Sequence, residues 1–259
     1  MSHVVKLGGH AIDEVGPESP VLVDLARDLA ALEGPVVLVH GGGPQIAALL
    51  RRLALESHFV DGLRATDAAT MEVVAMALGL VNAGIVVALQ HHGVDAVGLC
   101  GPDGRTVVGE VAGGNLGRVA THVRVRPELV RELWEARRIP VVSSVGLAPD
   151  GGLVNCNADT VAGALAGAIG VDELILLSDV DQVRSDPDDP ATALERIDGN
   201  ALTALLASGA LRDGMRPKAR AALDALAGGA RRIVLANGLR PHALRDAVSR
   251  SIPVTEVTA

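Results

Sequence analysis

Residues 36–40, VVLVH, form a short run that is apolar at four of five positions and ends directly in Gly41, Gly42, Gly43 and Pro44. A strand without polar alternation is typical of a parallel sheet that is covered on both faces. The glycines leave backbone amides unhindered where the strand ends and the next helix begins, and such a corner is a natural anion site. The run therefore predicts a covered parallel sheet that carries a binding site at one end of a strand.

The rest of the chain repeats this alternation of strand-like and helix-like runs, which predicts a mainly parallel sheet covered by helices. The strand-like runs are residues 4–7, 36–40, 95–99, 139–143, 173–177 and 232–235, with a last one near Pro253. The helix-like runs are 20–32, 45–55, 67–92, 127–136, 157–169, 199–208, 215–227 and 241–249, and Thr66 or Asp67 is expected to cap the long one. Turn clusters at 101–105 and 149–152 are interpreted as hairpin turns.

The composition narrows the classes of partner and compartment. A net charge of −8 and 1% aromatic residues argue against a nucleic-acid partner. Cys100 and Cys156 lack metal-ligand spacing and indicate a reducing compartment. We see neither the features of a signal peptide nor an apolar stretch of about 20 residues free of glycine or charge, so the expectation is a cytoplasmic protein without a membrane span.

Lysine is rare in this chain, because 21 of its 23 basic residues are arginines and only Lys6 and Lys218 are lysines. A lysine offers a compact point charge, whereas arginine offers a planar fork. Lys6 precedes Gly8 and Gly9 in VVKLGG, which forms a second strand-to-glycine corner. Two such corners side by side, with a lysine between them, would hold a polyphosphate. Neither corner has the spacing of a dinucleotide fingerprint or of a P-loop.

Further polar residues stand at strand ends and helix starts. Arg64 lies just before the long helix, where its fork could hold a carboxylate in two parallel hydrogen bonds. Asn155, Asn157 and Asp159 precede or open an alanine- and glycine-rich helix; Asn157 suits a cap, and Asp159 suits a residue that orients a charged group. Residues 178–181, SDVD, end a buried strand, where α/β sheets bind their ligands.

Six segments together resemble the amino acid kinase family and, within it, the N-acetylglutamate kinases. They are VVKLGG (4–9), VVLVHGGGP (36–44), DGLRATD (61–67), VNCNAD (154–159), LILLSDV (174–180) and DGMRPKA (213–219), and the resemblance extends from Val4 to about Val254. It implies a three-layer α/β/α sandwich with a mainly parallel central sheet in two lobes. Residues 1–177 would bind the amino acid and form a homodimer, and residues 178–259 would bind ATP.

The activity that the resemblance implies is ATP-dependent phosphorylation of the γ-carboxylate of N-acetyl-L-glutamate to an acyl phosphate, in arginine biosynthesis. Mg²⁺ would be carried on the nucleotide, without a dedicated protein site. Because the acceptor carboxylate is already ionised, the reaction needs positioning and charge stabilisation rather than a general base.

The same resemblance assigns roles to individual residues. Lys6 and Lys218 match the lysines that neutralise the transferred phosphoryl group, and Asp159 matches the aspartate that holds both. The residues that match the substrate site are Gly42, Gly43, Arg64 and Asn155. The residues that match the nucleotide site are Gly8, Gly9, Asp179, Val180, Asp181, Gln182, Val183, Leu211 and Met215.

The chain departs from the family pattern in three places. Gln182 stands where the family usually has glycine, and residues 117–121, GRVAT, replace an aromatic-containing segment that lies over the substrate. The sequence begins at the first strand, without the N-terminal helix of the arginine-inhibited hexamers, which leads us to expect a homodimer that arginine does not inhibit.

The sequence leaves two other functions open and disfavours a third. A sister kinase would act on glutamate or 2-aminoadipate linked to an amino-group carrier protein, with Arg118, Arg124 and Arg126 available to an acidic carrier. A non-catalytic amino acid sensor could use the same fold. A dinucleotide oxidoreductase is disfavoured by the missing fingerprint.

Overall fold

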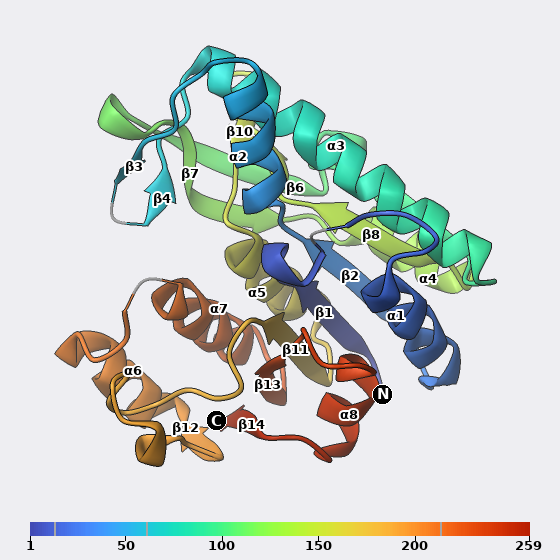
Figure 1. Ribbon diagram of the computed structural model, residues 1–259, viewed down its shortest axis with the longest axis vertical. Coiled ribbons are helices and arrows are strands. Elements are labelled where there is room, and N and C mark those ends of the chain that lie inside the picture. Colours follow the sequence, from blue (N-terminus) through green and yellow to red (C-terminus); the bar gives the residue numbers. More distant parts are fainter. Residues whose placement is uncertain (13, 61, 213) are drawn as a thin grey trace.

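The computed structural model describes residues 1–12, 14–60, 62–212 and 214–259; Asp61 and Asp213, which fall in two of the sequence motifs, lie outside the described residues. Its centre is an eight-stranded sheet in the order β12-β14-β13-β11-β1-β2-β8-β5 (Figure 1). The strands are β1 (His3–Leu7), β2 (Val36–His40), β5 (Ala96–Leu99), β8 (Ile139–Ser143), β11 (Glu173–Ser178), β12 (Arg196–Asp198), β13 (Arg232–Asn237) and β14 (Val254–Thr258). All neighbours in this sheet pair in parallel except β13 and β14. The predicted mainly parallel sheet is confirmed.

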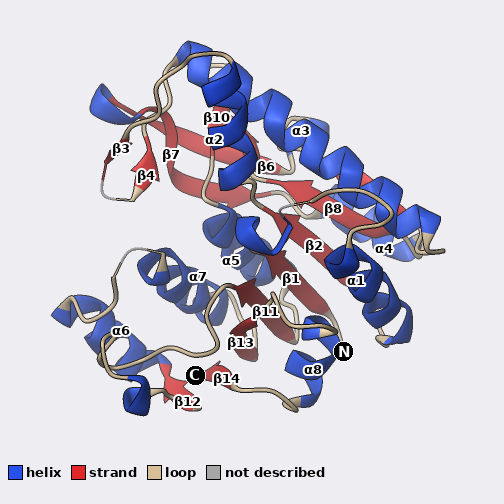
Figure 2. Cartoon of the chain, in the orientation of Figure 1, coloured by secondary structure: helices blue, strands red, loops and turns tan. Residues whose placement is uncertain are grey.

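Helices cover both faces of this sheet (Figure 2). One face carries α1 (Pro20–Ala31), α3 (Ala68–His91) and α8 (Ala243–Ser249), and the other carries α4 (Glu128–Glu135), α5 (Ala158–Ile169), α6 (Gly199–Ser208) and α7 (Met215–Ala227). Successive side chains of β1 point to opposite faces, so Val4 packs in the core that contains Leu165 of α5, and Val5 in the core that contains Ile85 of α3. The fold is therefore the expected three-layer α/β/α sandwich.

A smaller set of strands closes on itself at the end of the molecule where α2 (Gly43–Arg52) ends and α3 begins. These strands are β6 (Val107–Gly113), β7 (Gly117–Val125), β9 (Val145–Leu147) and β10 (Leu153–Asn155). The turn at 149–152 joins antiparallel β9 and β10, as the sequence predicts. Short 3₁₀ turns are η1 (Gly9–Ile12), η2 (Asp103–Arg105), η3 (Gly114–Leu116) and η4 (Pro190–Thr192).

The hairpin predicted at 101–105 is wrong. β5 belongs to the large sheet and β6 to the small one, so this turn is a corner between two sheets. A Cβ atom on Gly101 would lie 2.6 Å from backbone atoms of Val107, Val145 and Gly146. Glycine is therefore needed because three backbone segments meet there, and a proline-glycine turn signal does not reveal which strands it separates.

Helix α3 runs without interruption for 24 residues, and the Asp67 side chain accepts a hydrogen bond of 2.7 Å from the Thr70 amide at its start. Asp67, rather than Thr66, is the cap. Within the described residues α3 is the one helix long and apolar enough to cross a membrane, a test that the core helix of a globular protein also passes. Before it lies a ribbon of β3 (Phe59–Val60) and β4 (Leu63–Arg64), which is too short to be recognised in the sequence.

Candidate active site

The two glycine corners lie side by side. β1 and β2 are parallel neighbours in which Leu7 stands opposite His40, so both strands end at the same edge of the sheet. A Cβ atom on Gly9 would lie 3.2 Å from the Gly43 nitrogen and 3.0 Å from the Pro44 ring, so this close approach favours glycine. Backbone amides from two strands therefore meet at the carboxyl edge, where open α/β sheets bind ligands.

Both lysines of the chain converge on one carboxylate at this edge. Lys6 Nζ lies 2.9 Å from Asp159 Oδ1, and Lys218 Nζ lies 3.6 Å from Asp159 Oδ2. All three residues are buried, with exposed fractions of 6% for Lys6, 5% for Asp159 and 9% for Lys218. The three charged groups form a compact, water-poor cluster with a net charge of about +1.

Local sequence explains how α5 presents Asp159. The Asn157 side chain caps the helix by accepting hydrogen bonds from the amides of Asp159 (2.8 Å) and Thr160 (3.2 Å). The Asp159 carboxylate is thus not needed as the cap, and it faces the lysines instead. Asn157 is the cap that the sequence predicts.

Small residues bring α7, and with it Lys218, against α5. A Cβ atom on Gly163 would lie 2.6 Å from the Ala221 carbonyl oxygen, and one on Gly228 would collide with Gly167. The two helices therefore pack with their backbones in contact, which side chains larger than glycine would prevent at these positions. The alanine- and glycine-rich composition of α5 is therefore what permits this close packing.

The charges of the cluster shift the pKa values of its members. Burial alone raises the pKa of the Asp159 carboxyl, but the ammonium groups of Lys6 and Lys218 outweigh burial and hold that pKa below its ordinary value. Burial lowers the pKa of the Lys218 ammonium, and the positive charge of Lys6 lowers it further, although Asp159 raises it. Asp159 is therefore ionised at neutral pH, and the charge of Lys218 depends on Asp159.

A cavity of about 180 Å³ opens beside the second glycine corner. Its walls include backbone of residues 41–43 together with the predicted substrate residues Arg64 and Asn155. The Arg64 guanidinium donates a hydrogen bond of 3.2 Å to the Gly43 carbonyl and lies 4.7 Å from the centre of the Phe59 ring. The Asn155 amide donates to Thr66 Oγ1 at 3.0 Å. The structure thus brings Gly42, Gly43, Arg64 and Asn155 around one space.

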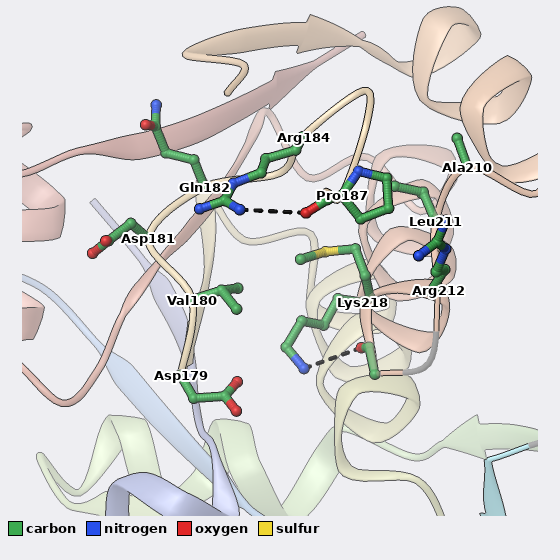
Figure 3. Close-up of a pocket in the computed structure, with 12 residues that line it drawn as sticks. Asp179, Val180, Asp181, Gln182, Arg184, Pro187, Ala210, Leu211, Arg212 and Lys218 are labelled. Carbon is green, nitrogen blue, oxygen red and sulfur yellow. Dashed lines mark hydrogen bonds between the residues drawn. The ribbon is translucent and has the colours of Figure 1, made fainter. Parts of the chain in front are cut away.

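A second cavity, of about 420 Å³, lies between the loop after β11 and the start of α7 (Figure 3). Six of the predicted nucleotide residues line it: Asp179, Val180, Asp181, Gln182, Leu211 and Met215. Lys218 stands at its inner end, where its ammonium donates a hydrogen bond of 3.1 Å to the Gly214 carbonyl, and the Asp179 side chain points toward it. Lys218 therefore belongs both to the wall of this cavity and to the charged cluster at Asp159.

Three predicted nucleotide residues lie elsewhere. Gly8 and Gly9 form the corner after β1 and do not line this cavity. Val183 is 1% exposed, and both of its backbone groups are used, because its amide donates to Thr255 Oγ1 (2.9 Å) and its carbonyl accepts from the Leu194 amide (2.8 Å). Val183 therefore anchors the loop in the core and offers a nucleotide no polar contact.

Other residues, which the sequence did not single out, hold the nucleotide loop in place. Asp181 Oδ1 accepts hydrogen bonds from Arg240 Nη2 (2.8 Å) and from Asn237 Nδ2 (3.2 Å). The Gln182 side chain points away from the cavity in Figure 3 and donates to the Val254 carbonyl at 3.0 Å. Asn237 ends β13 opposite Ser178 of β11, and a polar residue directly after the apolar run IVLA is the sequence signal that could have indicated this position. Within the described residues no group of three or more His, Cys, Asp or Glu side chains is placed to hold a metal ion.

Comparisons with known proteins agree with this geometry. The profile of the amino acid kinase family matches residues 1–237. Acetylglutamate kinases from Symbiobacterium thermophilum and Methanopyrus kandleri are each 41% identical to this chain, over 253 and 242 residues. The matches cover 93% and 90% of this chain and 85% and 94% of the relatives.

Solved structures share the fold over the whole chain. A Streptococcus mutans protein superposes with a TM-score of 0.81 at 26% identity and covers 100% of this chain and 98% of its own. Carbamate kinase from Giardia lamblia, bound to AMP-PNP, gives a TM-score of 0.72 at 17% identity, over 99% of this chain and 98% of that chain.

Proposed function

The chain belongs to the amino acid kinase family, and from that premise we propose that it is an acetylglutamate kinase. It transfers the γ-phosphoryl group of ATP to the side-chain carboxylate of N-acetyl-L-glutamate, a step of arginine biosynthesis. The observation that carries the proposal is an identity of about 40% to acetylglutamate kinases over nine tenths of the chain, with both of its lysines at one buried carboxylate.

The lysine cluster supplies the charge that phosphoryl transfer needs. The transferred group carries its negative charge on three equatorial oxygens, and catalysis is mostly positioning and electrostatic stabilisation. In the proposed mechanism Lys6 and Lys218 stabilise that charge from β1 and α7, while Asp159 keeps both ammonium groups aligned and Lys218 protonated. The attacking carboxylate needs no general base.

The two cavities divide the substrates between two lobes. We assign N-acetyl-L-glutamate to the cavity at Arg64 and Asn155, within residues 1–177, and ATP to the cavity after β11, mostly within residues 178–259. Arg64 would hold the α-carboxylate of the acceptor with its fork, and the amides at Gly42 and Gly43 would contact the phosphoryl group. Mg²⁺ would arrive with ATP, on the phosphate oxygens.

We also propose that the enzyme is a cytoplasmic homodimer formed through α3. Three apolar side chains are exposed along this helix: Met76 (54%), Leu80 (71%) and Val87 (52%). Exposed apolar patches of this kind mark protein interfaces, and a second copy of α3 would cover them.

The carrier-protein alternative would use arginines that are already engaged within the chain. Arg118 makes two hydrogen bonds of 3.0 Å with the Asp150 carboxylate, and Arg124 donates to Glu110 at 2.7 Å. A coupled assay of ADP release decides between the acceptors, with ATP and N-acetyl-L-glutamate in one arm and carrier-linked glutamate or 2-aminoadipate in the other. Turnover only with the carrier-linked acid would overturn the proposal, and binding of acetylglutamate without any turnover would favour the sensor.

The variant Lys218→Ala tests that turnover occurs at this site. It should lower kcat by about 10²-fold or more, because a charge that stabilises the transition state is lost. Arg216→Ala is the matched control, since Arg216 is an exposed cation on the same helix. The proposal predicts that this control keeps the activity of the wild type.

A further inference from the structure

His40 is a fully buried polar residue at the end of β2 that the proposed mechanism does not use. It stands directly before the glycine corner, and both nitrogens of its ring have partners. Nδ1 lies 2.9 Å from the carbonyl oxygen of Gly41, and Nε2 lies 3.0 Å from Nδ2 of Asn82 in α3. A buried histidine with two partners has a defined proton arrangement, which the neighbours determine.

The neighbours fix which nitrogen carries the proton. Asn82 Nδ2 lies 2.8 Å from the Val141 carbonyl, which can only accept, so this atom is the amide nitrogen and a donor. Its second hydrogen then points to His40, whose Nε2 must accept. Nδ1 therefore carries the ring proton and donates to Gly41. Burial lowers the pKa of His40 to about 4, so the ring stays neutral at neutral pH.

This hydrogen bond sets the direction of the next amide. A trans peptide is planar, and its C=O and N–H point in opposite directions. Because the Gly41 carbonyl points to the buried ring, the Gly42 N–H points away from it. A Cβ atom on Gly9 would lie 3.6 Å from the Gly42 nitrogen, so that nitrogen borders the first glycine corner. Because glycine permits a wide range of φ and ψ angles, the orientation of the Gly41–Gly42 peptide depends on the hydrogen bond between the Gly41 carbonyl and His40.

Gly98 of β5, two strands away from β2, leaves space for the Asn82 side chain that contacts His40. A Cβ atom on Gly98 of β5 would collide with Asn82 Oδ1. Asn82 is thereby held between β5 and β2, and a side chain at position 98 would move it without touching either glycine corner.

We infer that His40 is a positioning residue for phosphoryl transfer: oriented by Asn82, it holds the Gly41–Gly42 peptide with its N–H directed to the phosphate-binding corner. The inference rests on the proposed kinase function, and it adds a buried relay from α3 to the site. Asn82 and Gly98 act only through His40.

A series at position 40 separates the two hydrogen bonds of the ring. The His40→Asn side chain places an amide near the position of Nδ1, so it can still donate to the Gly41 carbonyl. The His40→Gln side chain can accept from Asn82 near the position of Nε2 but leaves the Gly41 carbonyl without this donor. The His40→Leu side chain makes neither hydrogen bond. We expect kcat to fall about 10- to 100-fold in the Leu and Gln variants, as for a displaced transition-state donor, and the Asn variant to recover most of the loss. In all three variants at position 40, KM for N-acetyl-L-glutamate should change by less than about threefold.

A role in folding alone gives a different pattern. In that case kcat would follow the melting temperature across the series, and Asn would be no better than Leu of similar stability. Equal kcat values for the Asn and Leu variants, or a wild-type kcat for Leu, would refute the inference. A nitrogen NMR spectrum of the wild-type ring should show a neutral Nδ1–H tautomer at pH 7, and an Nε2–H tautomer would also refute it.

Gly98→Ala provides the remote test, because it displaces Asn82 and leaves His40 and the glycines unchanged in sequence. It should lower kcat in the same direction as His40→Gln, and an unchanged kcat in a folded protein would contradict the relay. Failure of the proposed function is distinguishable, since it appears as absence of turnover in the wild type, whatever residue stands at position 40.

Discussion

Replacing Asp159 by asparagine removes the one negative charge between the two lysines while almost preserving the side-chain shape. At an effective dielectric constant of about 20, a pair of unit charges contributes about 6 kcal/mol at the 2.9 Å of Lys6 and about 5 kcal/mol at the 3.6 Å of Lys218. Desolvation offsets much of this, and measured losses for one partner of a buried pair are about 3–5 kcal/mol. We therefore expect Asp159→Asn to lower the free energy of unfolding by about 3–5 kcal/mol at pH 7.

The difference in the free energy of unfolding between the wild type and Asp159→Asn should become smaller as the pH falls. The folded pKa of Asp159 lies below its unfolded value, so the carboxylate stabilises the fold above about pH 4 and loses this effect as pH falls through the folded pKa. Urea denaturation should accordingly show the gap between wild type and variant closing in acid. Asp95→Asn is the matched control, since the Asp95–Arg138 pair is exposed and contributes at most about 1 kcal/mol.

Activity adds a second readout at alkaline pH. The folded pKa of Lys218 already lies below its ordinary value, and removing Asp159 removes an influence that raises it. The variant should therefore lose the Lys218 proton at a lower pH than the wild type, and the alkaline limb of kcat should move toward neutrality. At pH 7 we expect kcat to fall about 10²- to 10³-fold. An alkaline limb that stays in place, together with a stability loss under about 1 kcal/mol, would refute this account of the cluster.

Three further changes test other parts of the site and surface. Lys6→Arg keeps the charge but puts a larger guanidinium group in place of a compact ammonium in a packed position, so kcat should fall about 10²-fold while KM for N-acetyl-L-glutamate changes little. A near-wild-type kcat in steady-state assays would contradict the role of Lys6. Gln182→Gly frees the nucleotide loop from Val254 and should raise KM for ATP about 3- to 10-fold without changing KM for the acceptor, which initial-rate kinetics can separate. Leu80→Glu places a charge in the exposed apolar stripe of α3 and should halve the mass measured by light scattering, whereas the same change at exposed Leu239 should leave the mass unchanged.

The sequence by itself determined the layers of the fold and the identity of the charged groups. Continuous apolar runs such as VVLVH predicted strands buried on both faces, and helical spacing predicted the helices between them, because both patterns are local properties of the chain. The two lysines stood out in an arginine-rich composition before any geometry was available. The cap Asn157 was also predictable from local sequence, because its side chain accepts hydrogen bonds from amides only two and three residues further along the chain.

Only the tertiary structure decided which distant residues meet. Lys218 reaches Asp159 because glycines let α5 and α7 pack in backbone contact, and Arg240 reaches Asp181 because β13 lies beside β11. The structure also turned Val183 into the core, although its neighbour Gln182 lines the nucleotide cavity, and it joined the Gln182 side chain to the Val254 carbonyl of β14. Contacts of this kind depend on strand order and helix approach, and these are settled by packing between segments that are far apart in the sequence, which local periodicity does not encode.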